Sequence, residues 1–103
     1  TIDFVTWDPV HRTAEIGYAI SHLYWGKGLT PEAVQALIQL GFTRMKLERI
    51  QARCIAENIA SQRVMEKTNM TYEGTLRKSM LIKGTHRDIK LYSILREAYE
   101  AYH

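Results

Sequence analysis

The sequence contains few of the residues that cross-link a chain or interrupt its secondary structure: one cysteine, two prolines and six glycines among 103 residues. The single cysteine, Cys54, can form neither an internal disulfide nor a metal site built from several thiolates. This cysteine content fits a reducing compartment, and we expect a cytoplasmic location. We also expect Cys54 to be a small core residue and not a nucleophile.

Long apolar runs and blocks of like charge are missing as well. No stretch approaches the roughly 20 apolar residues that cross a bilayer, and no basic segment followed by an apolar one resembles a secretory signal, so we expect no membrane partner. The net charge is +3 and the isoelectric point is about 9.1. However, basic residues alternate with acidic ones, as at Lys46, Glu48 and Arg49. We therefore expect an evenly solvated surface and no nucleic-acid partner.

What is present is the composition of an ordinary globular domain, with 46% hydrophobic and 24% charged residues. There is no internal repeat, low-complexity tract or linker, so we expect residues 1–103 to form one domain. His11 and His86 have no partner at the spacing of metal ligands, and we expect no metal site.

The first half of the chain predicts a hairpin followed by a helix. The β-prone runs 2–7 and 14–20 flank a turn at residues 8–12. Thr30 is a good N-cap and Pro31 a good first helical residue, so a helix begins there. Its apolar residues recur at the three- and four-residue spacing of one buried stripe: Val34, Leu37, Ile38, Gly41, Phe42 and Met45.

The period then changes to two, which predicts a strand over 47–55 with one dry face. On that strand Ile50, Ala52 and Cys54 face one way, whereas Arg49, Gln51 and Arg53 face the other.

A second helix follows, capped by Asn58 and reaching about Lys67. We expect Ala60 and Val64 to face inward, and Asn69 to adopt the left-handed conformation that ends many helices.

Two long β-prone runs, 71–82 and 85–95, flank Lys83 and Gly84, which predicts a hairpin with a two-residue turn. The tail 96–102 favours a short helix. The predicted order of the main elements is therefore β-β-α-β-α-β-β.

A loop with two glycines lies immediately before the first helix, and it is the first candidate functional motif. Free backbone N–H groups at a helix start, the helix dipole and glycines that admit close approach favour an anion such as a phosphate. A plain helix cap with turn glycines remains the alternative. The loop lacks the Gly-Lys-Ser/Thr of a P-loop and the third glycine of a dinucleotide fingerprint. Its residues are Trp25, Gly26, Lys27, Gly28, Leu29 and Thr30.

Three further segments flank this loop in a recognisable order: Ala14–Tyr18, Asn58–Ser61 and Tyr72–Arg77. Together with the loop, they resemble the GNAT N-acetyltransferases, in particular the branch similar to ribosomal-protein N-terminal acetyltransferases. The resemblance implies an α/β (α+β) fold with a mixed, largely antiparallel sheet flanked by helices. It begins at what looks like the third strand of the family domain, so we expect the first strands and helices to be absent. An uncovered sheet edge then favours a homodimer.

The resemblance also implies acetyl-CoA as cosubstrate and a primary amine as acceptor, with a protein N-terminus as one candidate acceptor. By this resemblance, residues 25–30 wrap the pyrophosphate. Asn58 contacts the pantetheine arm, and the hydroxyl of Ser61 reaches the sulfur. Backbone groups at the end of the second strand bind the pantetheine and the thioester carbonyl, namely those of Ala19, Ile20 and Ser21.

Amine acetylation needs a group that removes a proton, because an alkylamine is protonated at neutral pH. Glu15 lies in an otherwise apolar strand and is our candidate base; the alternative is that it points to solvent or forms a salt bridge. Many family members carry a Tyr four residues after the Ser as general acid, and here that position is Met65. This departure motivates an alternative function, a non-catalytic acyl-CoA-binding module.

Overall fold

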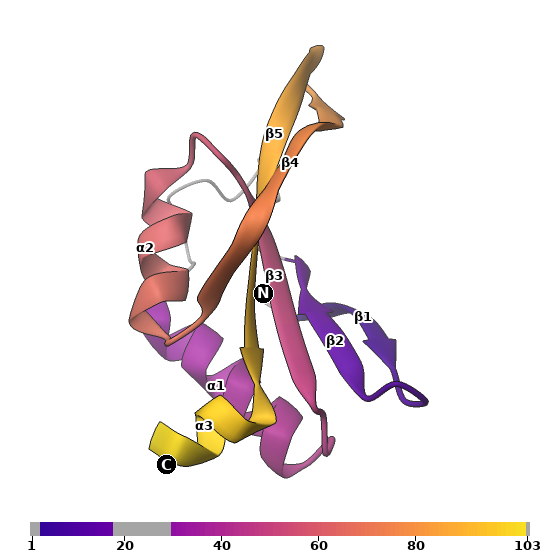
Figure 1. Ribbon diagram of the computed structural model, residues 1–103, viewed down its shortest axis with the longest axis vertical. Coiled ribbons are helices and arrows are strands. Elements are labelled where there is room, and N and C mark those ends of the chain that lie inside the picture. The colour runs from indigo at the N-terminus through magenta and orange to yellow at the C-terminus, as the bar shows by residue number, and fades with distance from the viewer. Residues whose placement is uncertain (1–2, 18–29, 103) are drawn as a thin grey trace.

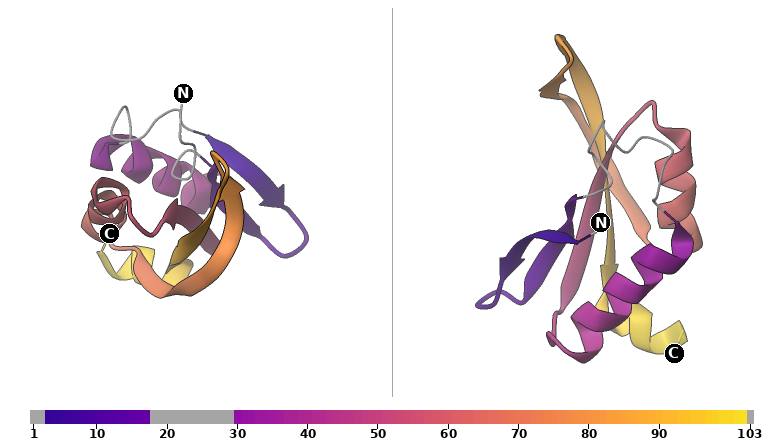
Figure 2. Two further views of the ribbon diagram at one scale, coloured as in Figure 1. Left: turned by 90° about the horizontal axis from the view of Figure 1, so that it is seen from above. Right: turned by 180° about the vertical axis from the view of Figure 1, so that it is seen from behind.

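The computed structural model describes residues 3–17 and 30–102. These residues form one five-stranded sheet, in the order β1-β2-β3-β5-β4, and three helices. All three helices lie on the same side of the sheet (Figures 1 and 2). The strands are β1 (Phe4–Asp8), β2 (Thr13–Ile16), β3 (Arg49–Ile55), β4 (Thr71–Ile82) and β5 (Thr85–Leu95), and the helices are α1 (Pro31–Thr43), α2 (Ile59–Lys67) and α3 (Arg96–Tyr102).

The sheet is mixed and largely antiparallel, which confirms the predicted fold class. Its one parallel pair within the described chain is β2 with β3, aligned from Thr13↔Arg49 to Ile16↔Ala52. Beyond that point β3 continues to Ile55, paired on its other edge with β5. Residues 53–55 of β3 therefore follow Ala52, the last β3 residue that pairs with β2 among the described residues.

The hairpin β1–β2 is held by its turn. The Asp8 carboxylate accepts hydrogen bonds from the backbone N–H groups of Val10 and His11, each at 3.0 Å. It also contacts the His11 ring at 2.8 Å, and this contact raises the pKa of His11 above its usual value. The turn aligns Thr6 with Glu15 on the neighbouring strand.

Helix α1 begins as predicted: the Thr30 hydroxyl accepts from the Ala33 N–H at 3.2 Å, and Pro31 takes the first helical position. Five of the six predicted stripe residues are buried helix residues, from Val34 to Phe42. The prediction was too long at the other end, because the helix stops at Thr43. The N–H groups of both Arg44 and Met45 donate to the Leu40 carbonyl, which turns the chain out of the helix.

Helix α2 begins after Asn58, as predicted; of the two residues predicted to face inward, Val64 does so and Ala60 does not. Ala60 is exposed, whereas Ser61 and Met65 are 5% and 1% exposed. Val64 is partly buried and packs against the core. The spacing of apolar residues did not identify the whole inward face, because that face includes short polar residues. Buried Thr68, for example, is tolerated there because its hydroxyl donates to backbone carbonyls within the same helix.

The β4–β5 hairpin has the predicted strand limits and extends past the rest of the sheet (Figure 1). Lys83 and Gly84 have φ of 52° and 77°, the left-handed pair of a two-residue hairpin turn. Asn69 also has the predicted positive φ, 67°. The pairing shifts register between Leu76 and Met80.

The core lies between the sheet and the helices and takes the predicted dry face of β3: Ile50, Ala52 and Cys54. Burial raises the pKa of the Cys54 thiol to about 11. The predicted tail helix, α3, adds a Tyr99 ring at 5.0 Å from that of Phe42. Within residues 3–17 and 30–102, no helix has the length and hydropathy to cross a bilayer, and no group of three potential ligands is placed to hold a metal.

Candidate active site

The junction between β3 and α2 positions Asn58 and Ser61. The Ala56 N–H donates to the Asp88 carbonyl at 2.9 Å, which ties the turn to β5, and the Asn58 N–H donates to the Ile55 carbonyl at 2.9 Å. The Asn58 side-chain oxygen caps the helix by accepting from the Ser61 N–H at 3.2 Å. The cap therefore fixes Asn58 and the first turn of α2 relative to each other.

The other end of the Asn58 amide is unusual. Its Nδ2 is buried and has no hydrogen-bond partner among the residues that the structure describes. A buried donor without a partner costs about 1–3 kcal/mol, so such groups commonly receive a partner from a ligand or water. An oxygen acceptor brought by a bound molecule would satisfy this donor.

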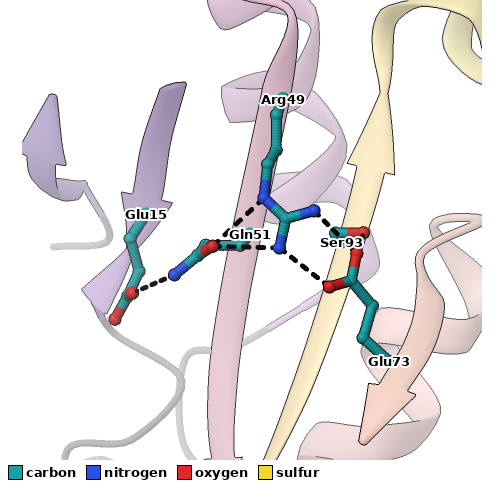
Figure 3. Close-up of polar contacts among 5 residues, drawn as sticks. All are labelled: Glu15, Arg49, Gln51, Glu73 and Ser93. Carbon is teal, nitrogen blue, oxygen red and sulfur yellow. Dashed lines mark hydrogen bonds and ion pairs between the residues drawn. The ribbon is translucent and has the colours of Figure 1, made fainter. Parts of the chain in front are cut away.

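Glu15 lies on β2 and is only 6% exposed (Figure 3). Its Oε1 accepts from Gln51 Nε2 at 2.7 Å, and its Oε2 accepts from Arg53 Nε at 2.8 Å. Of the alternatives left open by the sequence, the structure thus shows a buried ion pair and not a solvent-facing carboxylate.

The contacts of Glu15 continue across the polar face of the sheet (Figure 3). Arg49 donates to the Gln51 Oε1 through Nε at 3.2 Å and Nη2 at 3.0 Å. Its Nη1 and Nη2 also donate to the two oxygens of Glu73 at 2.7 and 3.0 Å, and Ser93 Oγ donates to Glu73 Oε2. Arg49 first, and Ser93 next, lower the pKa of Glu73 below its ordinary value.

Sequence reasoning missed this network, which we call the polar belt: Glu15, Gln51, Arg49, Glu73 and Ser93. The alternation in β3 did place Arg49, Gln51 and Arg53 on one face. Their carboxylate partners, Glu15 and Glu73, lie on other strands, however, and only the register of the sheet brings these partners together.

Several predicted site residues lie outside the described residues: Ala19, Ile20, Ser21, Trp25, Gly26, Lys27, Gly28 and Leu29. Of the predicted pyrophosphate loop, the structure describes only Thr30, as the N-cap of α1. Met65, at the position of the missing Tyr, is 1% exposed and part of the core.

The sequence profile of the acetyltransferase (GNAT) domain matches residues 1–71. The chain is 38% identical over 99 residues to the uncharacterized N-acetyltransferase p20 of Bacillus licheniformis; the match covers 96% of this chain and 56% of that protein. It is 30% identical over 92 residues to the ribosomal-protein-serine acetyltransferase of Escherichia coli, covering 89% and 51%.

Among solved structures, the fold is similar to that of the spermidine N-acetyltransferase from Vibrio cholerae in complex with CoA and spermine. The TM-score is 0.82 at 25% identity, and the match covers 96% of this chain and 59% of that one. The chain spans about half the length of the curated relatives it matches. The family profile covers well over half of the chain, and the fold agrees with it, so the chain belongs to the GNAT acetyltransferase family.

Proposed function

We propose that this chain binds acetyl-CoA and takes part in transfer of the acetyl group to a primary amine. One observation carries the proposal: the family match over residues 1–71 includes every position that we assign to the cofactor. The names of similar proteins point to amine acceptors of two kinds, a ribosomal protein and a polyamine. A protein N-terminus is our preferred acceptor class because the sequence resembles that branch.

Acetyl-CoA would be held at two places. Residues 25–30 lead into α1 and offer backbone N–H groups, two glycines and Lys27 to the pyrophosphate. Residues 19–21 offer backbone hydrogen bonds to the pantetheine and the thioester carbonyl. At the start of α2, the unpartnered Nδ2 of Asn58 is suited to donate to a pantetheine carbonyl, and the Ser61 hydroxyl to contact the sulfur.

Transfer requires that the amine lose a proton before or during attack on the thioester carbonyl. At pH 7 this costs an alkylamine about 4 kcal/mol unless a base assists. Glu15 is our proposed base, acting directly or through a water. Each carboxylate oxygen has two lone pairs, and its contacts with Gln51 and Arg53 occupy one on each oxygen. The remaining lone pairs are sufficient to accept a proton.

The departing group is a thiolate. Because a thiol has a pKa near 8.5, the thiolate leaves without full protonation, and a hydrogen bond from Ser61 would suffice in place of the missing Tyr. The buried position of Met65 favours one alternative, a non-catalytic acyl-CoA-binding module, because no side-chain donor stands there.

We further propose a cytoplasmic homodimer. The edge strand β4 supports it, because this strand exposes Tyr72, Leu76 and Leu81 by 51%, 46% and 63%. Sedimentation equilibrium of the chain tests the dimer directly, and a monomer at all concentrations would rule it out.

The experiment for the main proposal measures release of free CoA from acetyl-CoA with a thiol reagent. Two amines and one control are compared: a peptide with a free N-terminus, spermine, and, as the control, the same peptide acetylated at its N-terminus. Amine-dependent release supports an acetyltransferase. Saturable acetyl-CoA binding without amine-dependent release supports the non-catalytic module.

A further inference from the structure

The side chain of Gln51 contacts both Glu15, the proposed base, and the guanidinium of Arg49. These two contacts fix the orientation of the Gln51 amide. An amide can be turned so that its oxygen and nitrogen exchange places, but Arg49 has only donors to offer. The Gln51 oxygen therefore faces Arg49, which donates to it at 3.0 and 3.2 Å. The Gln51 NH2 must then face Glu15, whose Oε1 lies 2.7 Å away (Figure 3).

Arg49 is in turn held by the other side of the polar belt. It forms two bonds with the Glu73 carboxylate, at 2.7 and 3.0 Å, and such a paired contact sets the plane of the guanidinium. Ser93 on β5 donates to the same carboxylate. The side chains of Arg49 and Glu73 are 26% and 34% exposed, so this pair is partly shielded from water. Contacts on β4 and β5 thereby orient one of the two donors that reach Glu15 on β2, the Gln51 amide; the other donor is Arg53.

We propose that Gln51 is a positioning residue for acetyl transfer, acting through Glu15 and oriented by Arg49 and Glu73. The inference rests on the proposed role of Glu15 as base. In the step it serves, the N–H bond of the acceptor breaks, its proton forms an O–H bond with Glu15, and the electron pair stays on nitrogen to form a C–N bond with the thioester carbonyl carbon. The C–S bond of the thioester then breaks, and CoA leaves as a thiolate. A carboxylate held by two donors presents its remaining lone pairs in a constant direction, and catalysis is sensitive to such placement.

The test is a double-mutant cycle measured by steady-state acetyl transfer. Gln51→Met keeps the approximate size of the side chain and removes both of its polar atoms. We expect kcat to fall about 10- to 100-fold, since displacement of a catalytic group by about 1 Å can cost that much. The KM for acetyl-CoA should stay within about twofold. In the Glu15→Gln background, the same substitution should have no further effect on kcat.

A matched pair of variants tests the outer part of the belt. Glu73→Gln weakens the contact that orients Arg49, and we expect kcat to fall. Glu48→Gln weakens a comparable ion pair, Arg96 with Glu48 at 2.8 Å, which has no contact with Gln51, and we expect kcat to be unchanged. If Gln51→Met does not fold, Arg49→Lys replaces it, because an ammonium still pairs with Glu73 but lacks the fork that orients Gln51.

The outcomes separate this inference from the proposed function. If Glu15→Gln lowers kcat but Gln51→Met does not, the base stands and the positioning role is wrong. An equal loss from Gln51→Met in both backgrounds means a structural role only, which also overturns the inference. If Glu15→Gln retains full activity, or the wild-type chain transfers no acetyl group, the proposed base or function is wrong and the inference falls with it.

Discussion

Removing Arg53, whose partner carboxylate is buried, should destabilise the fold far more than removing an arginine whose partner carboxylate is exposed. Glu15 has a side chain only 7% exposed, and Arg53 is its charged partner at 2.8 Å. Among the described residues, substitution Arg53→Met leaves Gln51 as the remaining donor to this buried carboxylate. Breaking a buried pair from one side costs about 3–5 kcal/mol, and we take about 3 kcal/mol because Arg53 is itself 31% exposed.

Urea unfolding followed by circular dichroism measures this loss. For a domain of this size, with a slope of about 1.5 kcal/mol per molar urea, the midpoint should fall by about 2 M. The matched control is Arg87→Met, which removes a 2.8 Å pair with Glu57, a side chain 70% exposed. That change should cost no more than about 1 kcal/mol. Adding Glu15→Gln to Arg53→Met should restore part of the lost stability. Equal midpoints for the two arginine variants would refute the reasoning.

Three further predictions concern stability and thiol chemistry. Arg49 lowers the pKa of Glu73 in the folded state. The contact between them therefore stabilises the fold fully at pH values above the pKa of an unfolded Glu, about 4.3. This stabilisation is lost as the pH falls through the lower pKa that Glu73 has in the folded state. Unfolding free energies measured from pH 2 to 7 should show this loss in the wild type and a smaller one in Arg49→Met; identical pH slopes would contradict the assignment. Cys54 is buried, and the pKa of its thiol is about 11. A disulfide reagent at pH 8 should therefore label the native chain at least about 100-fold more slowly than the urea-unfolded chain. Comparable labelling rates would show that the thiol is accessible. Gly84 has φ of 77°, so Gly84→Ala should lower the unfolding free energy by about 1 kcal/mol, and an unchanged melting curve would show that the turn does not need glycine.

The elements whose signals are local were predictable from the sequence. Thr30 and Pro31 specify the start of α1, because a cap and a fixed φ act on adjacent residues. Lys83 and Gly84 specify the β4–β5 turn for a similar reason. The dry face of β3 followed from its period of two, since alternation is a property of a single strand.

The polar belt was not predictable in the same way. Its residues lie on four strands, and every contact except that of Arg49 with Gln51 depends on the alignment of those strands, as with Glu15 beside Gln51. The alternation in β3 identified Gln51 as outward-facing but did not identify its partners. Part of the inward face of α2 was missed because Ser61 is short and polar, and the apolar pattern gives such a residue no weight.

Calorimetric titration of the chain with acetyl-CoA tests the central claim most directly. We predict saturable binding at one site with micromolar affinity, and loss of that binding in Gly28→Val, where a side chain would block approach of the pyrophosphate to the backbone. A chain that is folded by circular dichroism but binds no acetyl-CoA would contradict the claim.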